Sequence, residues 1–138
     1  MSTISECLAT PHEFAHKGKT YSVSLITQNV KAAFEKRLFG RAREAASAMR
    51  DLMSTEDYRQ HLKALNDDYI AGQYAFESER GIKAVQTING MVSLCSLLFD
   101  IDEQEMLKII VERKEEVTSL VNLIFKESFP LDEQPSQS

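Results

Sequence analysis

A chain of 138 residues with 43% hydrophobic residues is long enough to bury a real core without disulfides or metal ions. Its net charge of −5 disfavours a general nucleic-acid binder, because such proteins need cationic groups to displace counterions from phosphates. With 27% charged residues and few glycines and prolines, the composition also argues against a disordered or a fibrous chain. We therefore expect a single folded domain over residues 12–129.

Both ends of the chain are polar and weakly patterned. Residues 1–11 contain Glu6 and lack both a basic start and a long apolar core, so they do not resemble a signal peptide. The longest apolar stretch, around Met91 to Phe99, is far shorter than the roughly 20 residues needed to span a bilayer. We predict a flexible leader over 1–11, a disordered tail over 130–138 and a location in the cytoplasm.

The first patterned segment predicts a β-hairpin. Residues 12–16 precede a turn at 17–19, after which Tyr21, Val23 and Leu25 alternate with serines, as in a strand with one buried face. A lone hairpin is marginal in water, so its apolar face must lie on helices or pair with another chain. The unpaired edge of this hairpin is a first indication of assembly.

Helical periodicity dominates the rest of the chain. Apolar residues recur every three or four positions over about 28–53, 54–72, 78–99 and from 102 onward, with a break near 113–116 that divides the last stretch. Side chains able to accept a hydrogen bond from a free amide precede these helices, namely Thr27, Ser54, Ser78 and Asp102. The sequence predicts a mainly α fold in which an N-terminal β-hairpin packs on a bundle of four to five helices.

The first long helix carries both an apolar stripe and a cluster of basic residues. The stripe recurs at intervals of three and four and consists of Val30, Phe34, Leu38, Ala42, Ala45, Met49 and Leu52. The basic cluster consists of Lys31, Lys36, Arg37, Arg41, Arg43 and Arg50. A solvated helix face is the simplest interpretation of the cluster, and an acidic partner helix is the functional alternative. No aromatic residues alternate with the cations for base stacking, so we expect no nucleic-acid partner.

No residue pattern indicates covalent chemistry or metal binding. His12 and His16 lie on a predicted strand, where a spacing of four residues separates them by about 13 Å, too far to share a metal ion. His61 has no further ligand nearby in sequence, and residues 66–68 lack the spacing of a calcium-binding loop. No phosphate-binding loop or nucleophile elbow occurs, and Cys95 is typical of a buried free thiol. We predict a non-enzymatic protein with no catalytic, cofactor or metal site.

Two short motifs resemble proteins that build bacteriophage tails. The run Phe14-Ala15-His16-Lys17-Gly18-Lys19-Thr20-Tyr21, followed by Leu25-Ile26-Thr27-Gln28 and a helix containing Ala33-Phe34-Glu35, is similar to the opening of tailed-bacteriophage tail assembly chaperones and related small phage morphogenesis proteins. The stretch Ala71-Gly72-Gln73-Tyr74-Ala75-Phe76 resembles a glycine-aromatic joint between helices in some of them. This resemblance implies a protein without catalytic residues that coats the aggregation-prone tape measure protein and helps recruit tail tube subunits.

Three functions remain open from the sequence. The first is a tail assembly chaperone that forms homo-oligomers and binds a tape measure or tail protein in the host cytoplasm. The second is a structural virion component, such as a head-tail connector or tail-associated subunit, and the third is an acidic inhibitor of a host protein. In each case the expected partner is a protein, with no nucleic acid and no membrane. For the assembly functions we predict partner contacts by residues whose apolar members could equally be core, namely Phe14, Tyr21, Val23, Phe34, Arg37 and Arg41.

Overall fold

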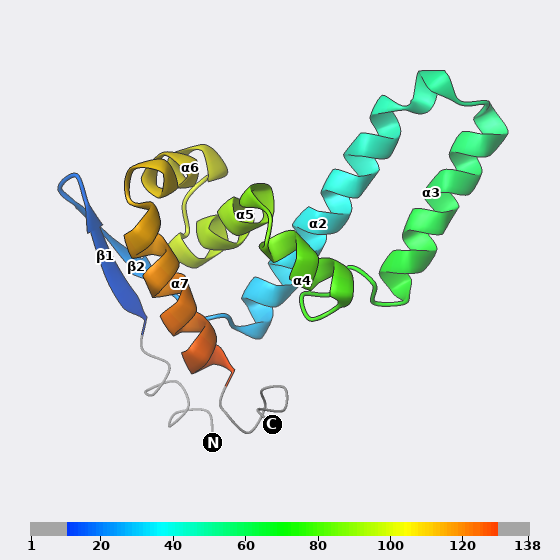
Figure 1. Cartoon of the computed structure of the whole chain (residues 1–138). Coiled ribbons are helices and arrows are strands. Elements are labelled where there is room, and N and C mark those ends of the chain that lie inside the picture. The colour runs from blue at the N-terminus through cyan, green and yellow to red at the C-terminus, as the bar shows by residue number, and fades with distance from the viewer. Residues whose placement is uncertain (1–10, 130–138) are drawn as a thin grey trace. The chain divides into compact units, whose positions relative to one another are not determined.

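The protein is mainly α-helical with an N-terminal β-hairpin, as predicted (Figure 1). The computed structural model describes residues 11–129, so the predicted leader, apart from Pro11, and the predicted tail lie outside the described residues. Within them, two strands and six α-helices follow in the order β1 His12–His16, β2 Lys19–Val23, α2 Gln28–Ala48, α3 Thr55–Ile70, α4 Glu79–Val85, α5 Ile88–Phe99, α6 Glu103–Glu112 and α7 Lys114–Ser128. A short 3-10 turn, η1, lies at Arg50–Leu52.

The chain divides into two compact units. Unit 1 contains the described residues up to Val30 and from Leu94 onward, and unit 2 contains Lys31–Ser93. Helices α2 and α5 each continue from one unit into the other. The presence of two compact units does not show whether each unit folds alone. The single domain predicted over 12–129 therefore stays a prediction.

The hairpin opens unit 1 and is closed by a two-residue turn. Lys17 and Gly18 have φ values of 50° and 81°, the positive values that a type I′ turn requires at both central positions. The turn sets an antiparallel register in which Phe14 lies opposite Tyr21 and His12 opposite Val23, so these four side chains share one face. Phe14 and Val23 are buried, which shows that this face is the one covered by helices.

The core of unit 1 lies under the hairpin and between α6, α7 and the end of α5. Asp102 caps α6 by accepting a hydrogen bond from the amide of Glu105 at 2.7 Å, as predicted. Arg113, with φ −132° and ψ 43°, ends α6 and begins α7, which confirms the predicted break. The buried apolar residues of this core are Leu94, Cys95, Leu98, Phe99, Met106, Ile109, Val117, Val121 and Ile124. Cys95 is a free thiol, as predicted.

In unit 2, α2 and α3 run side by side in opposite directions and are joined by η1, forming an antiparallel helix pair that we call the arm (Figure 1). Phe39 stacks on Tyr69 with ring centroids 4.4 Å apart, and the Arg50 guanidinium lies 5.7 Å from the Tyr58 ring centroid. The predicted first helix reached residue 53, whereas α2 ends at Ala48. The extended backbone of Met53 and Ser54 explains the difference, because the Ser54 hydroxyl needs that conformation to cap α3.

The predicted helix over 78–99 is wrong in one respect, because it consists of α4 and α5, which meet at an angle of 88°. Thr87 starts a new helix at the corner: its hydroxyl accepts from the Gly90 amide at 3.0 Å and donates to the Ala84 carbonyl at 2.7 Å. A Cβ at position 90 would come 1.8 Å from that carbonyl oxygen, so only glycine fits there.

The same arrangement occurs nine residues earlier in the chain. The Ser78 hydroxyl accepts from the Gly81 amide at 3.1 Å and donates to the Ala75 carbonyl at 2.7 Å. A Cβ at position 81 would come 2.3 Å from the Ala75 oxygen. The segment therefore contains two copies of one local motif, alanine, then serine or threonine three residues on, then glycine three residues further. Each copy begins a helix.

Candidate functional site

Three of the six predicted contact residues lie in the hairpin and belong to the core of unit 1. The Phe14 ring meets the Phe99 ring edge to face at 5.4 Å, and the half-buried Tyr21 ring lies 5.9 Å from Phe99. Val23 is completely buried. These side chains attach the hairpin to its own helices, and a role for them in binding a partner stays a prediction.

The other three predicted contact residues lie together in unit 2, at the base of α2. Phe34 is 2% exposed and packs edge to face against Phe76 with ring centroids 5.5 Å apart. Arg37 donates to the carbonyl of Ser93 at 3.1 Å and Arg41 to that of Asn89 at 3.4 Å. Both arginines thus join α2 to α5 within unit 2, a use that the sequence did not indicate. Partner contacts by this group stay a prediction as well.

Arg113 and His16 hold β1 on the helices of unit 1. The Arg113 guanidinium lies 4.7 Å from the Phe14 ring centroid, donates to the Ala15 carbonyl at 2.9 Å and also bonds Glu116. It lies 3.2 Å from Nδ1 of His16, and since a guanidinium only donates, that nitrogen accepts. Nε2 of His16 therefore carries the hydrogen that bonds Glu112 at 3.1 Å when the ring is neutral. His12 pairs with Glu127 of α7 at 2.7 Å. Both histidines that were considered above as metal ligands therefore attach β1 to the helices of unit 1.

The charged groups around this attachment neutralise one another. The hydrogen bond from Lys17 lowers the pKa of the Glu112 carboxyl, and the one from Arg113 lowers the pKa of Glu116. Tyr21 donates to Glu105 at 2.7 Å, which raises the pKa of the Tyr21 phenol. A shallow hollow of about 240 Å³ lies here, lined by residues that include His16, Lys19, Tyr21, Glu105, Lys108 and Glu112. Its carboxylates are already paired with neighbours, so the hollow offers structural contacts more than chemistry.

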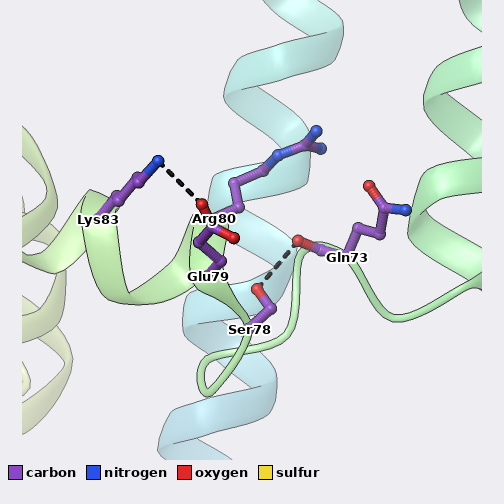
Figure 2. Close-up of a pocket in the computed structure, with 5 residues that line it drawn as sticks. All are labelled: Gln73, Ser78, Glu79, Arg80 and Lys83. Carbon is purple, nitrogen blue, oxygen red and sulfur yellow. Dashed lines mark hydrogen bonds and ion pairs between the residues drawn. The ribbon is translucent and has the colours of Figure 1, made fainter.

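A larger open hollow of about 520 Å³ lies in unit 2, at the start of α4 (Figure 2). Figure 2 shows Lys83 bonded to Glu79, at 3.0 Å, and the Ser78 hydroxyl bonded to the Gln73 carbonyl, also at 3.0 Å. The Arg80 guanidinium lies 4.4 Å from the Tyr74 ring centroid. The Ser78 hydroxyl donates to the Gln73 and Ala75 carbonyls and accepts from the Gly81 amide, so it is engaged in the local structure at the start of α4. The lining therefore shows no arrangement of nucleophile and base.

The arm offers the most unusual surface of unit 2, because its apolar residues are poorly covered. No residue of α3 is buried, although Tyr58, Leu62, Leu65 and Tyr69 recur at helical spacing and Tyr69 stacks on Phe39 of α2. A helix of this length usually owes its stability to the burial of such a stripe. The seam of the arm is therefore only half-buried.

The apolar stripe of α2 becomes more exposed toward the end of the arm at η1. Phe34 at its base is 2% exposed, whereas Met49 is 44% exposed and Leu52, in η1, is 81% exposed. Ala45 and Ala48 between them are exposed as well. We call Ala45, Ala48, Met49 and Leu52 the distal stripe, and it is the candidate functional site.

Few charges of the predicted basic cluster remain for a partner. Besides Arg37 and Arg41, Lys31 bonds Glu77 at 2.9 Å, and Arg43 lies 5.9 Å from the Phe39 ring centroid. Their first use is to hold α2 in unit 2. Lys31, Arg37 and Arg41 are thus structural, which differs from the solvated helix face that was the simplest interpretation of the sequence.

Residues 11–129 contain no group of three or more His, Cys, Asp or Glu side chains placed to hold a metal ion. In the same range, no individual helix has the length and apolar character needed to cross a membrane; α4 and α5 meet that criterion only as a pair, bent by 88°.

Sequence reasoning found the stripe of α2 but not which part of it is covered. The sequence carried no signal for this, because the continuous helix predicted over 78–99 is nearly as long as the stripe from Val30 to Leu52, whereas the structure has two short helices, α4 and α5, in its place. Comparison of the chain with protein-family models, with curated proteins and with solved structures found no match.

Proposed function

We propose that this chain is a non-enzymatic bacteriophage assembly protein, similar to a tail assembly chaperone, which binds a helical segment of a tape measure or tail protein through its arm. The observation that supports the proposal is the distal stripe, an apolar surface on α2 and η1 that the other residues of the described range 11–129 leave exposed. Its phage context rests on the two motifs described above, and its site of action would be the host cytoplasm.

The physical reason for a helical client is the shape of this surface. A helix with an exposed apolar stripe can pack against a third helix, at the usual interaxial distance of about 8–10 Å. Such a helix is recognised by apolar residues at intervals of three and four. Burying Met49 and Leu52 would contribute about 1.5–3 kcal/mol for each side chain that becomes fully covered.

Co-expression tests the proposal most directly. The full-length chain is produced with a tape measure protein of a tailed bacteriophage, and the complex is purified through a tag on that client. We expect the two proteins to purify together, and Leu52→Glu to weaken the complex strongly. Ser47→Glu is the matched control, because Ser47 is also exposed on α2 but lies about 160° around the helix from Ala45. Failure of the wild-type chain to purify with the client would sink the proposal.

A structural virion component would use the same apolar surface. Mass spectrometry of purified particles separates the two functions, because a chaperone leaves the finished virion and a connector or tail subunit stays in it. We expect the chain to be absent from the particles.

A further inference from the structure

One atom of Arg113 joins the edge of β1 to the ring of His16. Its Nη1 donates to the Ala15 carbonyl at 2.9 Å and lies 3.2 Å from Nδ1 of His16. Ala15 lies opposite Thr20, next to the pair that closes the two-residue turn, so the Ala15 carbonyl points away from β2. Because Nη1 carries two hydrogens, it can serve both acceptors at once.

This double contact requires a neutral ring. Nδ1 of His16 accepts only while it has no hydrogen, whereas Nε2 of the same ring donates to Glu112 at 3.1 Å. A proton on Nδ1 would place an N–H of a cationic ring against an N–H of a cationic guanidinium, so Nη1 would have to move away. Because the same Nη1 bonds the Ala15 carbonyl, its movement would also break the attachment of the β1 edge.

The cluster offers a second arrangement in which these charged groups stay paired. Nε and Nη2 of Arg113 both bond Glu116, so the guanidinium keeps this carboxylate when Nη1 moves. The protonated ring keeps Glu112, to which Nε2 still donates. At the other end of β1, His12 keeps Glu127, because a carboxylate accepts from a neutral and from a protonated ring. Release is therefore confined to the part of β1 near the turn.

The His16 ring is enclosed by charged side chains and is itself only 10% exposed. Within residues 11–129, the charged groups that face the ring or line the hollow beside it come from the turn, β2, α6 and α7, namely Lys17, Lys19, Glu105, Lys108, Glu112, Arg113 and Glu116. Arg113 lies at Nδ1 and Glu112 at Nε2, and Lys17 bonds the second carboxylate oxygen of Glu112 at 3.1 Å. The contact with Arg113 is therefore the one that a proton on this ring disrupts.

From this geometry we infer that His16 and Arg113 form a pH-sensitive latch: Arg113 holds the edge of β1 while His16 is neutral, and a proton on Nδ1 of His16 releases Arg113 from both the ring and the Ala15 carbonyl. Release leaves that carbonyl unpaired on the outer edge of β1, while His12 and the buried Phe14 keep the strand on its helices. The latch lies entirely in unit 1 and is independent of the function proposed for the arm.

NMR spectroscopy of the isotope-labelled full-length protein tests the latch from about pH 8 down to about pH 5.5, within the range in which histidines ordinarily change charge. Glu112 and Glu116 have lowered carboxyl pKa values, so both stay charged over this range. At its upper end we expect Nδ1 of His16 to have the resonance of a nitrogen without hydrogen, and Nε2 that of an N–H. As the pH falls, Nδ1 should gain its hydrogen, and the carbonyl carbon resonance of Ala15 should shift with the same midpoint.

Three variants separate the latch from the effect of the ring charge alone. Ala15 is the chain neighbour of His16, so a charge on the ring shifts its carbonyl resonance slightly even without a latch. Arg113→Gln should leave only this small shift, which makes the shift in the wild-type chain the larger one. His16→Gln should abolish the shift, and His12→Gln should leave it at its wild-type size.

Any of three results would overturn the inference. The first is a hydrogen on Nδ1 of His16 already at the upper end of the pH range, and the second is a ring that stays neutral down to its lower end. The third is an Ala15 shift of the same size in the wild-type chain and in Arg113→Gln, because the guanidinium would then have no part in the response.

Discussion

The hairpin with α6 and α7 in unit 1, and the arm in unit 2, are built from the same kind of apolar periodicity but differ in how much of it they cover. In unit 1 the stripes of α6 and α7 are buried at Met106, Ile109, Val121 and Ile124. In the arm, α3 buries no residue at all and the stripe of α2 ends in an exposed leucine. A similar pattern thus gives a core in one region and an open surface in the other.

This difference teaches that apolar periodicity shows only that a helix has a face able to pack. Which elements cover that face depends on the order of the elements in the chain and on where the fold places them. Unit 1 has three elements, the hairpin and two helices, converging on the end of α5. The arm has only two helices along most of its length, and two helices cannot enclose a core. We therefore expect stability to reside mainly in unit 1 and interaction in the arm.

The largest contrast should come from truncating an aromatic side chain in each region. Phe99 is 3% exposed and contacts both Phe14 and Tyr21, so Phe99→Ala should lower the free energy of unfolding by about 3–5 kcal/mol. Leu52→Ala, at a position 81% exposed, should change it by no more than about 0.5 kcal/mol. Urea denaturation measures both free energies of unfolding, and an equal decrease in the two variants would contradict the expected difference between unit 1 and the arm.

A pair of glycine substitutions should act in opposite directions within unit 2. Gly90→Ala forces a methyl against the Ala84 carbonyl and should destabilise by about 3 kcal/mol, the upper part of the range for overpacking. Gly40→Ala, in the middle of α2 with nothing within 4 Å of its added methyl, should stabilise by about 1 kcal/mol. Thermal melts followed by circular dichroism give the sign of each. No loss of stability in Gly90→Ala would contradict the geometry of the corner, and a loss in Gly40→Ala would contradict the open surroundings of Gly40.

Amide hydrogen exchange should separate the regions without any mutation. Amides of α3 open by local fluctuation, since no side chain of this helix is buried, whereas those of α7 should approach the protection of global unfolding. Exchange measured by mass spectrometry on the free protein provides the comparison. Equal protection of α3 and α7 would show that the arm is not the weaker region.

The smallest effect should be a dependence of stability on acid pH. Glu112 and Glu116 have carboxyl pKa values below the ordinary 4.5, so they stabilise the fold above that pH and lose this contribution as the pH falls through their lowered values. Stability should therefore decline as the pH falls below about 5. Arg113→Gln should flatten this decline, and Lys83→Gln, which removes the exposed pair with Glu79, should leave it unchanged. Urea midpoints across this pH range provide the measurement.

Local features of the fold could be predicted from the sequence because they depend on residues three or four apart. The caps at Ser54, Ser78 and Asp102, and the hairpin turn at Lys17 and Gly18, all form within such distances. The corner at Thr87 escaped prediction because the apolar stripe stays in register across it. The Thr87-to-Gly90 spacing was the signal that could have revealed it.

Long-range features could not be predicted in the same way. Arg113 and Ala15 are separated by 98 positions, and nothing local indicates that they meet. Burial of Phe14, Val23 and Phe34 likewise depends on elements far away in the chain. The sequence consequently identified which side chains are apolar enough for a contact, but not whether that contact is made inside the molecule.

The two-fold repetition of alanine, hydroxyl residue and glycine around α4 has a consequence for finding relatives of this chain. At these positions the backbone itself occupies the space where a methyl group would stand, so the constraint acts on atoms that every amino acid except glycine possesses. At the other positions of the segment many different side chains would fit without a steric clash. A search profile that weights this nine-residue spacing, and ignores the residues between, should detect divergent homologues that overall identity overlooks.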